Sequence, residues 1–369
     1  METDTYSYMG RTFSASTVDS SGAFSDCPSD RSGEFSTSPS SSASAAAAAS
    51  SSLHRLALSS SSSSSSSPTE SETLALIRDL ISGLDSPSLD LRRHSAMELR
   101  LLAKHSPQNR LLIAGAGAVR PLLSLLSHPD PLLQEHGVTA ILNLSLCDAN
   151  KDLIASSGAI KPLVSALKSG TPASKENAAC ALLRLSQIDD HKLAIGRSGA
   201  IPLLVDLLET GGHRGKKDAS TALYAICSNR ENKLRAVEAG IVRPLLDLMA
   251  DPESGMVDKA AYVLHAVASG TREGRRAAVE EGGIPVLVEV VEVGTQRQKE
   301  IAAATLLVIC EESPAHRAMV AREGAIPPLV ALSQSCTSRA KNKAEALIEL
   351  LRQPRSSSMN RGRAVDGSE

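Results

Sequence analysis

The sequence contains no tryptophan, and aromatic residues make up only 2% of its 369 residues. Sites for single-stranded nucleic acid usually need aromatic side chains on which bases stack. The net charge of -2 gives no general attraction to nucleic acids or membranes. The composition therefore argues against a nucleic-acid partner, and it requires that helix interfaces be filled by Leu, Ile, Val and Ala.

Targeting signals are missing as well. The start, Met-Glu-Thr-Asp, has no basic segment followed by an apolar core and is unlike a signal peptide. The longest run of small residues near it, Ala45 to Ala49, is too short to span a bilayer. We expect an intracellular protein without a membrane span, located in the cytoplasm, the nucleus or both.

The usual signatures of catalysis and metal binding are also lacking. None of the six cysteines forms a C-x-x-C pair, and no histidines cluster at zinc-ligand spacing. Four cysteines fall on apolar helical positions, where a reduced thiol acts as a small hydrophobic group. The stretch from Gly211 to Lys217 resembles a phosphate-binding loop, but Thr210 and Lys217 replace the glycine and the Ser/Thr that such a loop requires. We predict that the protein is not an enzyme and needs no cofactor.

The sequence does contain a repeat. A glycine followed closely by proline recurs every 41 or 42 residues, at Gly117, Gly158, Gly199, Gly240, Gly282 and Gly324. Two further markers keep the same interval. One is mostly polar (Asn109, Asn150, His191, Asn232, Gly274, His316) and the other is always small (Gly137, Ala178, Ala219, Ala260, Ala302, Ala344). A period near 42 with helical patterning predicts a solenoid of stacked helices, which offers a long surface to other macromolecules.

Each repeat unit is predicted to contain three helices. The first is short and begins at the polar marker, where Asn suits a helix cap. The marker glycine then permits either a turn or a close approach of helices. A proline stands in the first turn of the second helix, where a missing N–H costs nothing, and this helix ends near Gly170, Gly211 or Gly294 in several units. The third helix is the longest and carries the small position, which lets neighbouring helices pack closely.

Composition divides the chain into three parts. Residues 1–69 are dominated by serine and are predicted to be a disordered leader. Residues 70–353 form the repeat domain of about six and a half units, whose first unit is incomplete, and residues 354–369 form a flexible tail. Within the leader, the charged segment from Ser25 to Phe35 is either a docking or phosphorylation motif or simply a solvated part of the leader.

The repeat resembles the armadillo repeat. The stretches Ala140 to Leu144 and Gly158 to Val164 match its pattern closely, and the match recurs in register over about residues 70–353. The resemblance implies an all-α, right-handed superhelical solenoid. Among armadillo proteins the chain looks most like the plant U-box/armadillo family, because Asp30 to Phe35 in a Ser-rich leader is similar to the linker before the repeats of that family. In that family the repeats recognise partners, and a separate U-box recruits the ubiquitin-conjugating enzyme.

The leader is too short and too rich in serine to contain a U-box, which is a folded domain of roughly 70 residues. We therefore expect a non-catalytic interaction scaffold or adaptor in signalling or ubiquitin-linked regulation. The alternative is the substrate-recognition part of a U-box-type ubiquitin ligase whose catalytic-recruitment domain is absent from this chain.

The resemblance also implies where partners bind. In armadillo proteins the third helices line a concave groove, and an Asn on each helix holds an extended peptide. Only Asn143 is retained here, and the equivalent positions are Arg100, Arg184, Ala225, Ala266 and Val308. The Asn and Trp pattern of nuclear-import receptors is absent, which argues against a transport role.

We expect a monomer that binds an extended peptide or a helix of another protein in this groove. The candidate groove residues are Arg93, Arg100, His136, Asn143, Asn177, Arg184 and Tyr262. The polar N-terminal half and the apolar C-terminal half of the groove suit a partner with an acidic stretch followed by an apolar one. A basic inter-helix loop provides a candidate second contact through His213, Arg214, Lys216 and Lys217.

Overall fold

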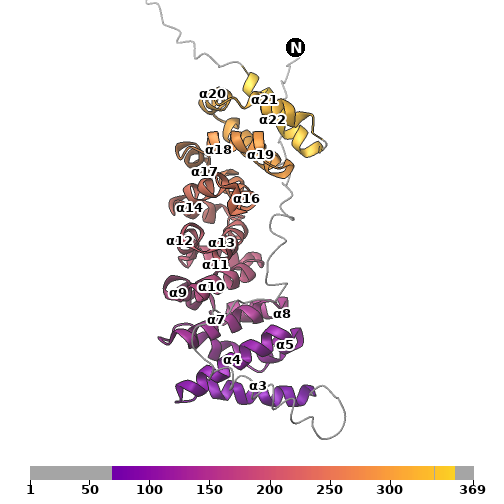
Figure 1. Cartoon of the computed structure of the whole chain (residues 1–369). Helices are drawn as coiled ribbons and strands as arrows, with labels where there is room; N and C mark the ends of the chain where they lie inside the picture. The colour runs from indigo at the N-terminus through magenta and orange to yellow at the C-terminus, as the bar shows by residue number, and fades with distance from the viewer. Residues whose placement is uncertain (1–68, 336, 354–369) are drawn as a thin grey trace, which may run out of the picture.

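The computed structural model describes residues 69–335 and 337–353, and every regular element in these ranges is helical. The predictions for the leader before Thr69 and for the tail after Gln353 lie outside the described residues. The helices form one elongated stack that advances from α3 (Glu70–Leu84) at one end to α22 (Ser338–Arg352) at the other (Figure 1). The predicted all-α armadillo solenoid is confirmed.

Each complete unit contains a short first helix, a second helix and a longer third helix. The first helices are α5 (Pro107–Gly115), α8 (Asp148–Ser156), α11 (Asp189–Arg197), α14 (Arg230–Glu238), α17 (Arg272–Glu280) and α20 (Pro314–Arg322). The second helices are α6 (Val119–Leu125), α9 (Ile160–Ser169), α12 (Ala200–Thr210), α15 (Val242–Met249), α18 (Gly283–Val293) and α21 (Ile326–Ser333). The third helices are α7 (Pro131–Ser145), α10 (Pro172–Leu185), α13 (His213–Ile226), α16 (Val257–Ala268), α19 (Gln296–Glu311) and α22.

Two elements depart from this pattern. The incomplete first unit consists of α3 and α4 (Leu89–His105), which take the places of a second and a third helix as predicted. A short 3-10 helix, η2 (Pro252–Ser254), lies between α15 and α16. No helix among the described residues combines the length and the hydropathy that a bilayer crossing requires.

The small marker lies inside a hydrophobic core that runs through the stack from Ile77 on α3 to Ile348 on α22. A Cβ atom added to Gly137 would lie 2.9 Å from the Cβ of Leu125 and 3.3 Å from the carbonyl oxygen of Leu122. Larger side chains have no room at this position because second and third helices meet there. The predicted reason for the small marker is therefore confirmed.

The glycine marker serves the conformation of the backbone. The φ angles of its six members lie between 75° and 89°, in the left-handed region that residues with a side chain rarely adopt. A Cβ atom added to any of them would meet no heavy atom within 4 Å. The marker glycine therefore provides the predicted turn. The other predicted role, a close approach of helices, is wrong.

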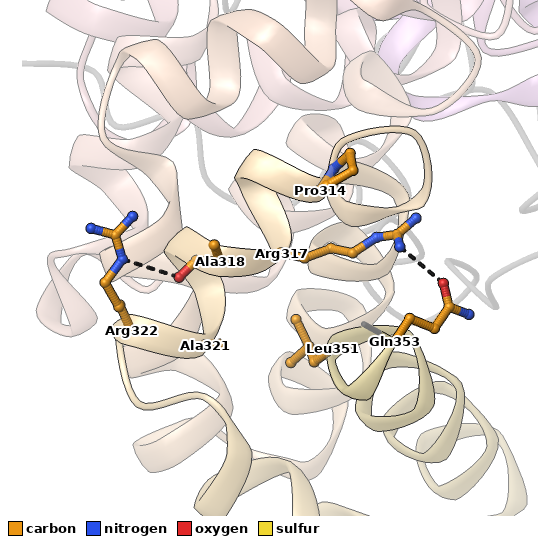
Figure 2. A pocket seen from close by; sticks show the side chains of 7 residues that line it. All are labelled: Pro314, Arg317, Ala318, Ala321, Arg322, Leu351 and Gln353. Atoms are coloured by element: carbon orange, nitrogen blue, oxygen red, sulfur yellow. Dashed lines mark hydrogen bonds between the residues drawn. The ribbon is translucent and has the colours of Figure 1, made fainter. Parts of the chain in front are cut away.

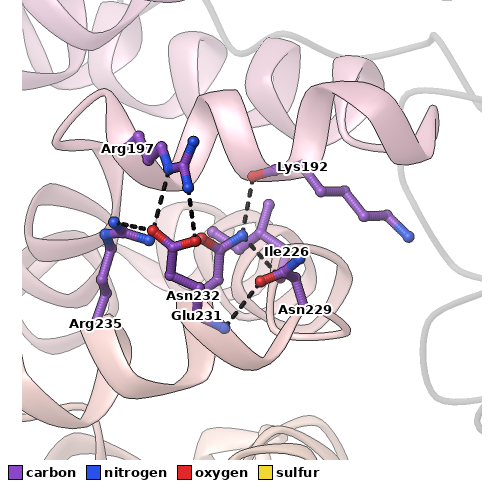
Figure 3. Close-up of polar contacts among 7 residues, drawn as sticks. All are labelled: Lys192, Arg197, Ile226, Asn229, Glu231, Asn232 and Arg235. Carbon is purple, nitrogen blue, oxygen red and sulfur yellow. Dashed lines mark hydrogen bonds and ion pairs between the residues drawn. The ribbon is translucent and has the colours of Figure 1, made fainter.

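The polar marker does not cap the first helix, contrary to the prediction. Both α8 and α14 begin two residues before their marker asparagine. The buried amide of Asn232 donates from Nδ2 to the carbonyl oxygens of Lys192, at 2.9 Å, and Ile226, at 3.0 Å (Figure 3). Asn150 makes the same two bonds to the unit before it. The marker asparagine thus ties its first helix to the preceding first helix and to the end of the preceding third helix.

The four cysteines among the described residues are packing groups. Cys180 and Cys310 lie within α10 and α19, whereas Cys147 and Cys227 are cap residues of α8 and α13 and not interior helical residues. Burial raises the pKa of the Cys227 and Cys310 thiols to about 12. Both thiols are therefore protonated at neutral pH and are poor nucleophiles.

Candidate protein-interaction face

The third helices form a continuous surface along one side of the stack. Each third helix packs against the next from α4 to α22. In Figure 1, α13, α16, α19 and α22 lie on one side of the stack, and α9, α12, α14 and α17 lie on the other. We define the third-helix face as the surface made by the candidate groove residues together with the residues that occupy the equivalent positions of the repeat on the later third helices.

Four of the candidate residues make polar contacts between α4 and α7. The guanidinium of Arg93 pairs with Asp130, the N-cap of α7, with Nε 3.1 Å from Oδ1. Nη1 of Arg100 lies 3.4 Å from Nδ1 of His136. Nδ2 of Asn143 donates to the carbonyl oxygen of Arg100 over 3.0 Å. The structure thus brings these candidates together at the N-terminal end of the face.

Burial and hydrogen bonding set the protonation states of these residues. It lowers the pKa of His136 to about 4, and the positive charge of Arg100 acts in the same direction. His136 is therefore neutral at pH 7, and Nδ1 accepts from Arg100 in the tautomer with the proton on Nε2. Burial also lowers the pKa of Arg100, while the Glu135 carboxylate opposes this change. The hydrogen bond from Arg93 holds the pKa of Asp130 at about 2.

Asn177 on α10 connects three successive third helices in one row. Its Nδ2 donates to Oγ1 of Thr139 on α7 over 2.9 Å, and its Oδ1 accepts from Nη2 of Arg214 on α13 over 2.6 Å. The Arg214 guanidinium also lies 3.6 Å from the carboxylates of Glu176 and Asp218. The row places an amide on α10 beside a guanidinium on α13 along the face.

The predicted basic inter-helix loop is wrong as a structural element. His213 is the first residue of α13, and Arg214, Lys216 and Lys217 follow in its first two turns. Gly211 ends α12 and Gly212 is the N-cap of α13, so the connection is only these two residues long. The predicted groove and the predicted second contact therefore meet at Arg214.

Several candidates are more buried than a solvent-facing groove position. Asn143, Asn177 and Tyr262 are buried, and Arg184 on α10 is 9% exposed. One N–H of the Asn143 amide donates to the carbonyl oxygen of Arg100, which leaves its second N–H and Oδ1 for the peptide-holding role implied for this residue. A direct contact of these residues with a partner stays a prediction.

The C-terminal half of the face carries basic residues that the sequence analysis omitted. The guanidinium carbon of Arg297 lies 5.1 Å from the centre of the Tyr262 ring, and Nε donates to the Tyr262 hydroxyl over 3.0 Å. Lys259 and Arg297 occupy the registers of Asn177 and Arg214 two units later. Stepping along the repeat from Arg214 would have found Arg297. The half predicted to be apolar therefore contains charged side chains as well.

A cavity of about 300 Å³ lies at the C-terminal end of the stack, among α20 and α22 (Figure 2). Arg317 donates from Nη1 to Oε1 of Gln353 over 2.9 Å, and Nε of Arg322 donates to the carbonyl oxygen of Ala318 over 3.3 Å. The cavity is lined by Pro314, Arg317, Ala318, Ala321, Arg322, Leu351 and Gln353. Across residues 69–335 and 337–353, no group of three His, Cys, Asp or Glu side chains is placed to hold a metal ion.

Comparison with known proteins identifies the family. The model described as the plant U-box protein ARM repeat region matches residues 76–361. The chain belongs to this family. A relative of this plant U-box armadillo chain is the E3 ubiquitin-protein ligase SPL11 of rice, Oryza sativa subsp. japonica, which is 54% identical over 76 residues. The match covers 21% of this chain and 11% of the rice protein, so the chain spans only a small part of that relative's length.

Solved structures share the fold of this plant U-box armadillo chain. An engineered protein superposes with a TM-score of 0.66 at 26% identity, over 75% of this chain and 68% of that one. A designed armadillo repeat protein in complex with the peptide (KR)4 superposes with a TM-score of 0.50 at 20% identity, over 74% and 99% of the two chains. The second likeness concerns the fold alone. Family and fold together make this armadillo region a protein-interaction scaffold.

Proposed function

We propose that the chain binds an extended, acidic segment of another protein along the third-helix face. The observation that carries this proposal is the row of Thr139, Asn177 and Arg214, in which hydrogen bonds link polar side chains of three successive third helices. Packed helices lie about 10 Å apart, which is the length of about three residues of extended chain at ~3.3 Å each. A partner in extended conformation would therefore offer a carbonyl or a carboxylate to each helix in turn.

The charge of the face supports an acidic partner. The designed armadillo protein solved with (KR)4 binds a basic peptide, which makes peptide binding a reasonable mode for this fold. Here Arg100, Arg214 and Arg297 stand along the face, so the opposite charge is complementary. Complementary charge sets specificity and association rate more than affinity. We propose that the chain acts as a monomer in the cytoplasm or nucleus.

Selection of peptides on the full chain tests the proposal. Peptides selected from a random library should be enriched in Asp and Glu. Their Kd should rise at least tenfold when Lys217→Glu and Arg297→Glu are combined, because like charges at an interface cost several kcal/mol. The matched control combines Arg243→Glu and Arg276→Glu, whose exposed side chains lie on α15 and α17. Selected peptides that bind both double variants equally would place the binding site elsewhere.

A second, finer proposal links this scaffold to ubiquitin transfer, and the family match favours it. We propose that the face recognises the substrate of a U-box-type ligase, because the matched region is that of plant U-box proteins and the rice relative is named a ubiquitin ligase. Incubation of the full chain with ubiquitin, activating enzyme and a conjugating enzyme tests whether the chain builds ubiquitin chains itself. Chain formation would make the protein a ligase, and its absence across conjugating enzymes would leave a recognition role.

A further inference from the structure

We infer that the C-terminal end of the stack binds a helix pair of another protein, which covers α20 and α21 as one further repeat unit would. This surface consists of first and second helices, so it is separate from the third-helix face and goes beyond the proposed function. α20, α21 and α22 form the last unit that the structure describes. The chemistry of the occupant follows from the junctions inside the stack, where the next unit covers the same repeat positions.

Two apolar residues of α21 are exposed, although the residues at the same repeat positions are buried in earlier units. Ile326 is 37% exposed and Val330 is 38% exposed. Their equivalents on α18, Ile284 and Val288, are only 2% and 5% exposed, because α21 packs against α18. The corresponding residues of α12 and α15 are buried in the same way. The exposed pair on α21 is therefore half of the interface that joins successive second helices, and an apolar surface of this kind marks a contact site.

The cavity between α20 and α22 occupies the place where the next unit inserts an amide elsewhere in the stack. At the first junction, Asn150 donates from Nδ2 to the carbonyl oxygens of Arg110, at 3.0 Å, and Leu144, at 3.1 Å. The residues at these two repeat positions in the last unit are Arg317 and Leu351. Both line the cavity of about 300 Å³ (Figure 2). The cavity is therefore the seat of an Asn side chain that the occupant supplies.

Arg322, at the end of α20, indicates a carboxylate on the occupant. Its side chain is exposed, and its Nε donates to the carbonyl oxygen of Ala318 on its own helix. Arg197 holds the same position on α11, where Nε and Nη2 lie 3.0 and 2.9 Å from the two carboxylate oxygens of Glu231 on the next first helix (Figure 3). Glu231 directly precedes the marker Asn232. An occupant with Glu followed by Asn thus pairs with Arg322 and fills the cavity at the same time.

A second copy of the chain does not provide this occupant. The described part of its N-terminal end begins with α3, which takes the place of a second helix, so no first helix precedes it there to fill the cavity. α3 also exposes Ala75, Arg78 and Asp79. Burying these charges against Ile326 and Val330 would be unfavourable. We therefore assign the occupant to another protein.

A helix pair copied from inside the stack tests the inference. The probe is a fluorescein-labelled peptide of residues 148–169, which contains α8 and α9, with Ala149→Glu so that a Glu precedes Asn150. Its anisotropy should show saturable binding to the full chain. Asn150→Ala in the probe should raise the Kd about tenfold, because two hydrogen bonds are lost. Arg322→Glu in the chain should raise it at least tenfold, and a probe with Ala149→Arg should restore binding to that variant.

Matched variants locate the site on the chain. Val330→Asp should raise the Kd at least tenfold, because a charge would be buried against the probe, and circular dichroism checks that this variant is folded. Val293→Asp combined with Arg272→Glu makes the same kinds of change at exposed residues of α18 and α17 and should leave the Kd unchanged. Acidic peptides selected on the third-helix face should not displace the probe, and competition would place the probe on that face instead.

Three results would overturn the inference. The first is no binding of the probe to the full chain, and the second is an equal Kd for the natural chain and Arg322→Glu. The third comes from sedimentation of the full chain alone, because a dimer that Val330→Asp disperses would make a second copy the occupant. The proposed function does not depend on any of these results, since acidic peptides bind the third helices.

Discussion

The contact between Gly196 and Asn232 is the sharpest test of how successive units are held together. A Cβ atom added to Gly196 on α11 would lie 1.8 Å from Oδ1 and 2.4 Å from Cγ of Asn232. The same amide donates to the carbonyl oxygens of Lys192 and Ile226 (Figure 3). Gly196→Ala must therefore displace the amide and break at least one of the two bonds between units.

The magnitudes follow from the buried bonds. A hydrogen bond contributes about 0.5–1.5 kcal/mol net, and a buried group left without a partner costs about 1–3 kcal/mol. We expect Asn232→Ala to lower the free energy of unfolding by about 2–4 kcal/mol. Gly196→Ala should lower it by about 1–3 kcal/mol, after the gain of about 0.5–1 kcal/mol that alanine brings to a helix.

The double variant separates this mechanism from a general loss of packing. Once Asn232 is alanine, the methyl group at position 196 has room, so the double variant should be no less stable than Asn232→Ala alone. The two substitutions should couple by about 1–3 kcal/mol in a double-mutant cycle. Urea denaturation of the full chain followed by circular dichroism measures all four stabilities, and equal m-values show that the variants unfold in the same way. Additive effects of the two substitutions would refute the reasoning. The control is Gly115→Ala, which should leave the free energy of unfolding unchanged because a Cβ atom at this position meets no heavy atom within 4 Å.

Three further predictions follow from burial and charge. The pKa of about 2 for Asp130 means that its pairing with Arg93 stabilises the fold at neutral pH and is lost as the pH falls from about 4 to 2; NMR titration of the carboxyl measures this. Burial lowers the pKa of His265 to about 4, so the unfolded chain takes up the proton first and stability should fall between about pH 6.5 and 4. His265→Gln should flatten that part of the stability profile in urea titrations at several pH values. Ala219→Leu, at a fully buried position, should cost about 1–3 kcal/mol by thermal or urea denaturation, whereas no change would mean that the third helices tolerate a wider spacing.

The repeat made most of the fold predictable, because its signals are local. The glycine turns, the prolines in the second helices and the small positions all depend on conformation or packing at one site. The role of Asn232 depends on carbonyl groups six and 40 residues away, which a residue-by-residue interpretation cannot supply. The same limit applies to Arg184, whose burial depends on neighbouring helices, and to the stretch from His213 to Lys217, which is predicted as a loop although it forms the start of α13.

A fourth periodic signal escaped the sequence analysis although it is fully regular. A basic residue follows the polar marker in every unit, at Arg110, Lys151, Lys192, Lys233, Arg275 and Arg317. Nζ of Lys233 donates to the carbonyl oxygen of Ser269, the C-cap of α16, over 2.7 Å. Nε of Arg317 donates to the carbonyl oxygen of Cys310 at the end of α19 over 2.9 Å. The repeat stacks the third helices in the same direction, so the partial negative charges of their C-terminal ends lie side by side, and Lys233 and Arg317 offset those of α16 and α19.

The basic residues at the opposite ends of the third helices oppose the helix dipole. The first turns of α13 and α19 contain no acidic residue, yet Arg214 and Arg297 stand there, where the helix dipole is positive and a basic side chain is unfavourable by a few tenths of a kcal/mol. Glu176 and Asp218 offset the charge of Arg214 only at 3.6 Å. Residues that oppose a local preference are expected where function requires them. Cations at the C-terminal ends stabilise the stack, whereas the cations Arg214 and Arg297 at the N-terminal ends support the proposal that the third-helix face binds an acidic partner.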